Sequence, residues 1–271
     1  MAKMIAITNQ KGGVGKTTTS INLAASLAAN NQRILLIDLD PQGNATMGSG
    51  VDKNRLVLTC NDVLLRDCLA EQAVLSTSAG FDLIPANGDL TVAEVSLMQQ
   101  DHRETYLFKA LQPLQTNYDY ILIDCPPALN TLTINALVAA DSVLIPMQCE
   151  YYALEGLAAL LASVEQIKSS VNPRLYIEGV LRTMYDGRNR LCQDVSKQLL
   201  EHFNDKLYRS VIPRNIRLAE APSHGMPALH YDKSSPGAKA YMVLASEIMD
   251  AQTSSSLPIP STNLGQEDTS I

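Results

Sequence analysis

The chain has 271 residues, of which 46% are hydrophobic and 18% are charged, so it is long enough to bury one large core. Its formal net charge of −7 argues against a protein that coats nucleic acid with a generally basic surface, although a local basic patch stays possible. No apolar run reaches the roughly 18 residues of a membrane span, and the residues before the first motif leave no room for a signal peptide. Five scattered cysteines without a CxxC pair indicate reduced thiols, so we expect a cytoplasmic protein.

Short apolar runs alternate with helix-length segments along most of the chain. The apolar runs predict strands at residues 4–8, 33–40, 81–86, 118–127, 141–148, 175–185 and 207–214. Helical periodicity covers residues 16–30, 90–100, 103–115, 130–140, 153–167 and 193–203. Several strands are apolar nearly throughout, as expected where helices cover both faces of a sheet. The alternation predicts an α/β fold with a doubly wound, mainly parallel sheet flanked by helices.

The chain is predicted to form one domain, residues 1–250, followed by a short tail. Residues 48–80 are less regular, and we expect a small helical excursion there. The last helix is expected to end near Asp250. Residues 251–271 are rich in Ser, Thr and Pro and carry no helical stripe, which predicts a disordered segment.

A glycine-rich stretch, GGVGKT from Gly12 to Thr17, follows the first predicted strand and precedes a helix. It is a variant of GxxxxGK[ST], because Gln10 stands where many phosphate-binding loops have their first Gly. Backbone N–H groups of such a turn and of the following helix N-terminus converge on one point and favour anions. Lys16 would bridge the outer phosphates of ATP, and the Thr17 hydroxyl would ligate Mg²⁺. The predicted nucleotide-binding residues are Lys11, Gly12, Gly13, Val14, Gly15, Lys16, Thr17 and Thr18.

Carboxylates follow two of the predicted strands. Asp124 ends the apolar run YILID, so it is expected beside the glycine loop, where it can hold Mg²⁺ through water. Asp38 and Asp40 occur in LLIDLDPQGNAT, with Asp40 beyond the strand. Hydrolysis needs a water oriented in line with the γ-phosphate, and Asp40 is the better placed for it. Asp38 is predicted to support either Mg²⁺ or the loop.

Five motifs occur in one order: KGGVGKTT, DLDPQGNAT, IDCPP, QCEYYALEGL and IPRNIRLAEAPSHG. Together they resemble the ParA/Soj family of chromosome- and plasmid-partitioning ATPases, in the MinD/ParA deviant Walker group of P-loop NTPases. The resemblance covers about residues 3–249. It implies an ATPase that uses Mg²⁺, hydrolyses ATP to ADP and phosphate slowly, and is stimulated by its partner and by DNA.

The resemblance also assigns roles to residues. Lys11 would be the signature lysine that touches the phosphates of the opposite subunit in a dimer, so Lys11, Lys16 and Asp40 are the expected catalytic residues. Gly12 would permit the close approach of the two subunits. Pro213 and Asn215 resemble the residues that contact adenine, for which an amide offers both a donor and an acceptor. An interface segment near the nucleotide is expected at Glu150, Tyr151 and Glu155.

The implied cycle begins with an ATP-driven homodimer that binds double-stranded DNA without sequence preference. A ParB/Spo0J-type protein then stimulates hydrolysis, so the protein is expected on the nucleoid and away from the membrane. Arginines around the last two strands would contact DNA phosphates, because each neutralised phosphate adds counterion release. The predicted DNA-binding residues are Arg188, Arg190, Arg214 and Arg217, with Arg182 in the same cluster and with Arg188 and Arg217 as the leading candidates.

Three alternatives share parts of this pattern. A MinD-like or other cargo-positioning ATPase has the same loop, but the membrane-bound type needs a basic amphipathic helix, and residues 251–271 contain no Lys or Arg. An iron-protein-like electron carrier would need two cluster cysteines, and neither Cys125 nor Cys149 lies in a glycine-rich loop. The presence of Asp40 argues against a scaffold that binds ATP without turnover. Because only eight residues precede Asn9, no additional operator-binding domain is expected.

Overall fold

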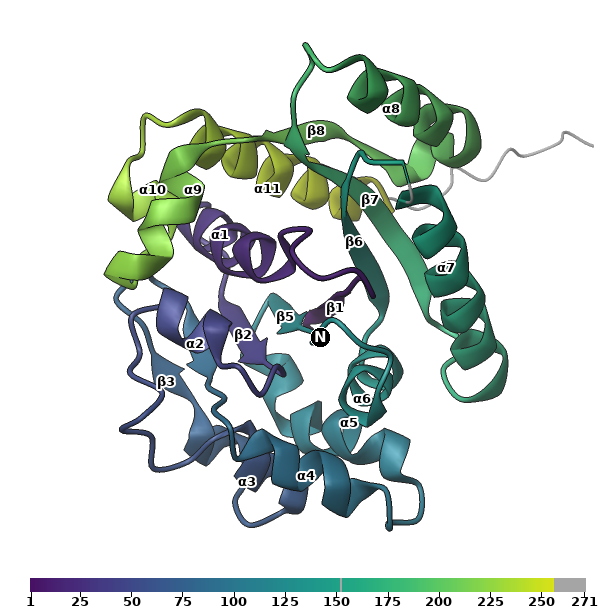
Figure 1. Cartoon of the computed structure of the whole chain (residues 1–271). Helices are drawn as coiled ribbons and strands as arrows, with labels where there is room; N and C mark the ends of the chain where they lie inside the picture. Colours follow the sequence, from purple (N-terminus) through teal and green to yellow (C-terminus); the bar gives the residue numbers. More distant parts are fainter. Residues whose placement is uncertain (152, 256–271) are drawn as a thin grey trace, which may run out of the picture.

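A computed structural model describes residues 1–151 and 153–255 of the chain. Within these residues the centre is an eight-stranded sheet in the order β3-β4-β2-β5-β1-β6-β7-β8 (Figure 1). Every neighbouring pair is parallel except β3 and β4 at one edge, which confirms the predicted doubly wound α/β fold. The strands are β1 Lys3–Ile7, β2 Ile34–Asp38, β3 Leu75–Ser76, β4 Asp82–Ile84, β5 Tyr120–Asp124, β6 Ser142–Gln148, β7 Tyr176–Tyr185 and β8 Leu207–Pro213.

Helices cover both faces of this sheet (Figure 1). They are α1 Lys16–Ala29, α2 Asn44–Gly48, α3 Cys60–Leu65, α4 Leu90–Leu97, α5 Tyr106–Leu111, α6 Thr131–Ala139, α7 Ala153–Ser170, α8 Arg190–Phe203, α9 Ile216–Glu220, α10 Ala228–Tyr231 and α11 Pro236–Ser255. Alternate residues of β1 supply the two cores, because successive side chains of a strand point to opposite faces. Ile5 and Ile7 pack with α1 and α11, whereas Met4 and Ala6 pack with the core under α3 to α8.

The irregular region contains more structure than the sequence pattern indicates. Residues 48–80 hold the short α3, as expected, and also β3, which the pattern did not reveal because both of its residues are exposed. The helix predicted over 103–115 is instead α5 between two 3₁₀ turns. Pro113 lies in the second turn, where it cannot continue an α-helix. The helix predicted from 193 begins at Arg190, because the Asn189 side chain accepts a hydrogen bond from the N–H of Cys192 and caps it.

The last helix, α11, extends to Ser255, five residues beyond the boundary set at 250. Residues 251–255 are therefore helical, and the remainder of the predicted disordered tail, 256–271, lies outside the described residues. In the part of the chain that is described, no helix combines the length and apolar character needed to cross a membrane.

Candidate nucleotide site

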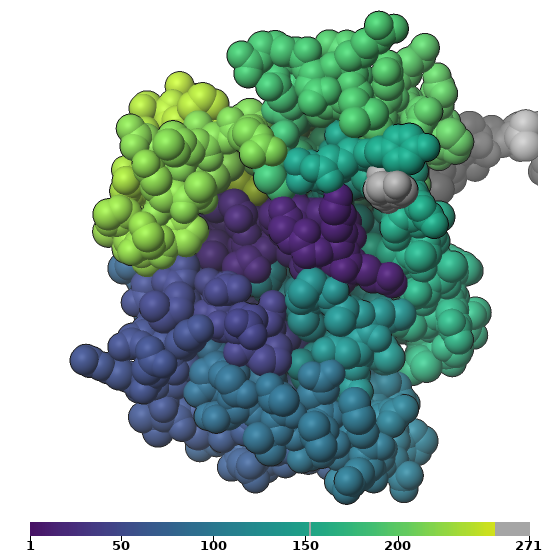
Figure 2. Space-filling model, viewed as in Figure 1, coloured from purple at the N-terminus to yellow at the C-terminus, as the bar shows by residue number. Residues whose placement is uncertain are grey.

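Three adjacent strands bring the predicted site residues to one edge of the sheet. The parallel register pairs Ile7 of β1 with Asp124 of β5, and Asp124 with Asp38 of β2. All three strands end there, so the loops that follow them meet at the carboxyl edge, where open α/β sheets bind ligands. Figure 2 shows the segment that follows β1, in purple, exposed near the centre of one face of the molecule.

The loop between β1 and α1 has the backbone of a phosphate-binding loop. Gly13 and Gly15 have φ values of 75° and 89°, a region in which a side chain is strained. Gly15 caps α1 without a side-chain hydrogen bond, so the first N–H groups of the helix remain available to an anion. The Thr183 hydroxyl of β7 donates to the carbonyl of Val14 at 2.7 Å and fixes the loop from the other side.

Lys16 lies inside this loop with 7% of its surface exposed. Its Nζ donates to the carbonyl of Lys11 at 3.1 Å. Burial lowers the pKa of the Lys16 amine, and the negative charge of Asp124 offsets part of that effect. An anion bound at the N-terminus of α1 would supply the missing compensation, so the position of Lys16 fits a phosphate group.

Asp124 is fully buried and accepts hydrogen bonds on both carboxylate oxygens. Thr17 Oγ1 donates to Oδ2 at 2.8 Å, and Ser20 Oγ donates to Oδ1 at 2.7 Å. Burial raises the pKa of Asp124, and the charge of Asp38 raises it further. Hydroxyl and carboxylate oxygens are the ligands that Mg²⁺ prefers, and a cation here would stabilise the ionised carboxylate. The structure therefore brings together Thr17 and Asp124, the predicted metal residues.

The carboxylate of Asp38 accepts its hydrogen bonds from the loop and helix that follow β2, the segment that includes Asp40. Its Oδ2 accepts the N–H of Thr46 at 2.8 Å and the Thr46 hydroxyl at 2.7 Å, and its Oδ1 accepts the N–H of Asp40 at 3.2 Å. Burial raises the pKa of Asp38 to about 6, while the hydrogen bonds from Thr46 act in the opposite direction. Of the two roles predicted for Asp38, these contacts correspond to support of the loop.

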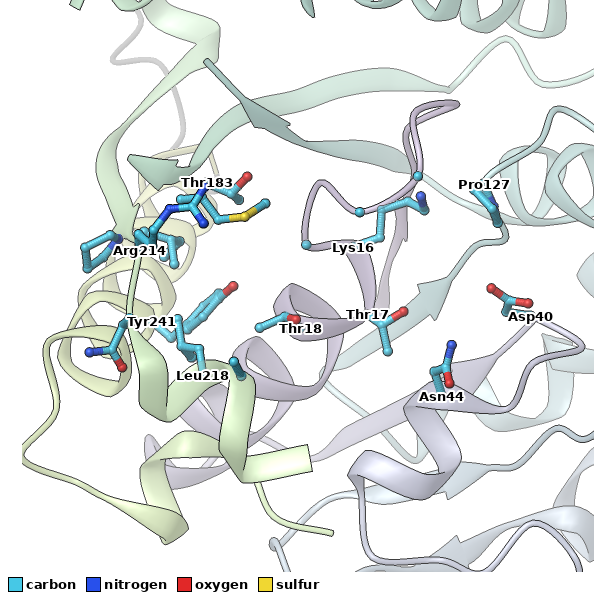
Figure 3. A pocket seen from close by; sticks show the side chains of 18 of the residues that line it. Lys16, Thr17, Thr18, Asp40, Asn44, Pro127, Thr183, Arg214, Leu218 and Tyr241 are labelled. Carbon is cyan, nitrogen blue, oxygen red and sulfur yellow. The ribbon is translucent and has the colours of Figure 1, made fainter. Parts of the chain in front are cut away.

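Asp40 itself lies at the pocket wall. It is 8% exposed. Its Oδ1 accepts the N–H of Gln42 at 2.9 Å, and this hydrogen bond fixes the orientation of the carboxylate. Figure 3 shows Thr17, in the first turn of α1, and Asp40, in the loop after β2, bordering the same opening.

The opening continues into a pocket of about 510 Å³. Ile212 and Leu218 give its far end apolar walls, and Pro213 and Asn215 line the same end, as predicted for a base. The Oδ1 atom of Asn215 is buried and has no hydrogen-bond partner among the described residues. A buried acceptor without a partner is costly, so this atom is suited to the amino group of a ligand.

Several pocket residues carry no motif that could have identified them. Thr183 and Met184 come from the end of β7, and Tyr241 comes from α11, where its hydroxyl lies 3.0 Å from Thr19 Oγ1 of α1 (Figure 3). Gly237 allows α11 to begin beside Leu218, because a Cβ on it would lie 2.6 Å from Leu218 Cγ. The fold brings these residues to the glycine loop from far along the chain, because Thr183 and Tyr241 lie 168 and 226 residues after Gly15.

Lys11 points away from the pocket that its neighbours form. Its Nζ pairs with Glu150 Oε2 at 2.5 Å, and the two side chains are 42% and 44% exposed. The Lys11 N–H donates to Asn9 Oδ1, while the Asn9 amide donates to the carbonyl of Pro146, so the loop is held next to the end of β6. Of the other predicted interface residues, Tyr151 is exposed and Glu155 lies in the first turn of α7.

The predicted DNA-binding arginines are exposed at the ends of β7 and β8. Arg190 opens α8, and Arg188 pairs with Asp186 at 3.0 Å. Arg214 follows β8 and lines the nucleotide pocket, between Pro213 and Asn215 (Figure 3). Arg217 pairs with Glu220 at 2.8 Å and with Asp232 at 3.3 Å.

Arg182 corrects the expected cluster. It is 8% exposed and donates to Ser196 Oγ and to the carbonyl of Tyr208, at 2.8 and 2.9 Å. It therefore joins β7, α8 and β8 inside the protein and presents no charge at the surface.

Comparison with known proteins agrees with this geometry. The family model described as "AAA domain" matches residues 2–177. Sporulation initiation inhibitor protein Soj of Bacillus subtilis (strain 168) is 52% identical over 249 residues, 92% of this chain and 98% of that protein. Chromosome partitioning protein ParA of Caulobacter vibrioides (strain NA1000 / CB15N) is 49% identical over 253 residues, 92% of this chain and 95% of that one.

A solved structure resembles the whole fold. Cobyrinic acid a,c-diamide synthase from Mycobacterium smegmatis, with a bound ATP analog and magnesium, superimposes with a TM-score of 0.82 at 35% identity, covering 94% of this chain and 97% of that one. Fold and glycine loop thus define the class, a P-loop nucleotide-binding domain. Within it, the chain belongs to the ParA/Soj family of chromosome-partitioning ATPases, which confirms the resemblance seen in its motifs.

Proposed function

We propose that this protein is a nucleotide-controlled DNA anchor for segregating chromosomes or plasmids. With ATP and Mg²⁺ bound it forms a homodimer that holds double-stranded DNA without sequence preference, and hydrolysis returns it to a monomer that releases DNA. The observation that carries this proposal is the direction of Lys11. Its amine pairs with Glu150 outside its own pocket, whereas Lys16 lies in that pocket, beside the glycine loop.

Different residues around the pocket bind the phosphates, Mg²⁺, the attacking water and the adenine ring. The N–H groups of the glycine loop and Lys16 hold the phosphates, and Thr17 and Asp124 hold Mg²⁺, which would neutralise charge on the phosphates. Asp40 orients the attacking water. Pro213 contacts the adenine ring, and the unpartnered Oδ1 of Asn215 accepts a hydrogen bond from its amino group.

Lys11 acts on the nucleotide of the opposite subunit. In the single chain its charge is neutralised by Glu150, so assembly requires Lys11 to exchange that carboxylate for a phosphate. Gly12 is next to it, and a Cβ on Gly12 would have no atom within 4 Å among the described residues. Nothing inside this part of the chain requires glycine at that position, which is consistent with a requirement imposed by a second subunit.

DNA binds the arginines at the ends of β7 and β8, and dimerisation doubles their number on one assembly. A ParB/Spo0J-type protein stimulates the slow hydrolysis, and the protein works on the nucleoid in the cytoplasm. We favour this function over that of a membrane-bound MinD-like ATPase because residues 251–271 contain no Lys or Arg. The working unit is residues 1–250.

The proposal is tested by measuring molecular mass and retention on random-sequence DNA with ATP, with ADP and without nucleotide, each with Mg²⁺. A dimer that holds DNA only with ATP is expected. Equal DNA retention in all three conditions would falsify the switch. Omission of Mg²⁺ serves as the control for the role of Thr17 and Asp124, and it should abolish turnover.

A further inference from the structure

One segment of the chain has a marked excess of acidic over basic side chains. Residues 60–101 contain seven carboxylates and one basic side chain, Arg66, a net −6 where the whole chain carries −7. The Arg66 guanidinium lies over the ring of Tyr106, 4.2 Å from its centroid, and makes a cation–π contact there. The segment includes α3, α4 and the β3–β4 edge of the sheet, which lie at one end of the molecule (Figure 1). Four of its carboxylates are exposed there: Asp67, Glu71, Asp89 and Asp101.

An apolar ridge crosses this acidic end on α4. Val92, Val95 and Met98, here named the α4 stripe, are 55%, 56% and 52% exposed. They recur every three residues along one side of the helix and of its C-terminal boundary. The opposite side is buried in the core, through Leu90, Ala93 and Leu97. Exposed apolar side chains that form one ridge with polar surroundings are typical of an interaction site.

Acidic side chains are found at both ends of this ridge. Asp89 directly precedes α4, and Asp101 follows Met98 by three residues; both are exposed. Arg103 also lies at the Met98 end, where its Nη1 donates to the Met98 carbonyl at 3.0 Å, so among the described residues the carboxylate without a neighbouring cation is the one at the Asp89 end. We propose that the α4 stripe binds a basic amphipathic segment of a partner protein, with apolar side chains on the ridge and Lys or Arg beside the carboxylates. A nucleic acid or an anionic membrane would be repelled, as would the same acidic surface of a second copy. This chain's own residues 251–271 contain no Lys or Arg and lack the complementary charge.

The chain that enters α4 also supports the Asp40 loop. The N–H of Ala86 donates to Thr46 Oγ1 at 2.9 Å, and the same hydroxyl donates to Asp38 Oδ2 at 2.7 Å. The other oxygen of Asp38 accepts the N–H of Asp40. Three residues separate Ala86 from Leu90, where α4 begins.

A second contact joins the same two segments. Gly43, in the turn after Asp40, lies so close to Ala86 that a Cβ on it would be 2.6 Å from the Ala86 carbonyl oxygen. A shift at the start of α4 therefore moves the backbone on which the Asp40 turn rests. Occupancy of the α4 stripe is thus coupled to the position of Asp40, and this step rests on the function proposed above.

Binding is tested on the full chain with a fluorescent synthetic helical peptide that carries Leu on one face and Arg and Lys on the other. The double change Val92→Ser with Val95→Ser should weaken its binding at least tenfold. The control is Val243→Ser, an equally exposed valine on α11 (60%), which should change binding less than twofold. Affinity should also fall as salt rises. Equal affinities of the three proteins, or equal binding of a peptide with Glu in place of Arg and Lys, overturn the proposal.

Coupling is tested by phosphate release with Mg²⁺ and ATP. The peptide should change the wild-type rate severalfold and leave the double variant unchanged. The double variant should also keep the thermal unfolding midpoint and ATP-dependent DNA retention of the wild type. If wild type itself fails to retain DNA, the proposed function fails, while peptide binding still decides the docking surface. A lower molecular mass of the double variant without peptide would instead show that the stripe joins copies of this chain, which overturns the proposal.

Discussion

At the scale of single residues, the proposed function assigns separate targets to Lys11 and Lys16. Lys11→Ala should leave ATP binding within about twofold, because its amine does not enter its own pocket, yet it should abolish ATP-dependent dimerisation or turnover. Lys16→Ala should lose ATP binding itself. The ATP dissociation constant can be measured by nucleotide titration, and dimerisation by molecular mass in the same buffer. A similar loss of ATP binding in the two variants would show that Lys11 acts within its own subunit.

The ion pair between Lys11 and Glu150 is expected to have a small effect on dimerisation. Both side chains are nearly half exposed, and exposed ion pairs contribute about 0.5 kcal/mol. Glu150→Gln should free Lys11 and strengthen ATP-dependent dimerisation by about two- to threefold, the equilibrium equivalent of that free energy. Sedimentation at several protein concentrations measures it. Glu165→Gln on α7, which loosens the pair with Lys168, is the matched control and should have no effect.

Asp40 differs from Asp38 although both lie in one short motif. Asp40→Ala should lower turnover by about a hundredfold or more while an ATP-bound dimer still retains DNA, since only the water loses its partner. Asp38→Ala should instead unfold the loop, because three hydrogen bonds to Thr46 and Asp40 depend on it. Single-turnover hydrolysis combined with DNA retention separates the two. Unchanged turnover in Asp40→Ala would refute its assignment.

At the scale of elements, two glycines of the site loops differ in whether the surrounding chain leaves room for a side chain. Gly43 has φ +61° and touches the Ala86 carbonyl, so Gly43→Ala should destabilise the fold by about 1–3 kcal/mol. Gly12 has neither restriction within the described chain, and Gly12→Ala should stay within about 0.5 kcal/mol of wild type but lose dimerisation. Urea unfolding and mass distinguish the outcomes. Destabilisation by Gly12→Ala would place its role inside the single chain.

Sequence patterns identified the elements that local physics determines. The strands were predictable because buried parallel strands are continuous apolar runs, and the glycine loop because its backbone and charges serve phosphate binding. The end of the pocket that we propose for adenine was only partly predictable. Pro213 and Asn215 came from a motif, whereas Thr183 and Tyr241 reach the pocket through the fold alone. Arg182 was misjudged because a strand pattern does not tell whether a charged side chain will find buried partners such as Ser196.

At the scale of the whole molecule, charge is divided between opposite edges of the sheet. Residues 60–101, at the β3–β4 edge, carry a net −6. Residues 183–217, at the β7–β8 edge, contain seven basic and four acidic side chains, a net +3 without the buried Arg182. The nucleotide site lies between them, at the ends of β1, β2 and β5 (Figure 1). If DNA and a basic protein partner bind as proposed, they use different surfaces of one subunit and do not compete.

The two edges should therefore respond to mutation independently. Arg188 is almost fully exposed and, among the residues that the structure describes, its ion pair is with Asp186 in its own loop. Arg188→Glu should therefore weaken DNA retention and lower the dependence of DNA affinity on salt. It should leave ATP-dependent dimerisation and binding of the basic peptide at α4 within about twofold, because sites without shared partners act additively. Val92→Ser with Val95→Ser should do the reverse. Loss of dimerisation in Arg188→Glu would mean that this arginine belongs to the subunit interface, and weaker peptide binding would mean that the two edges are coupled.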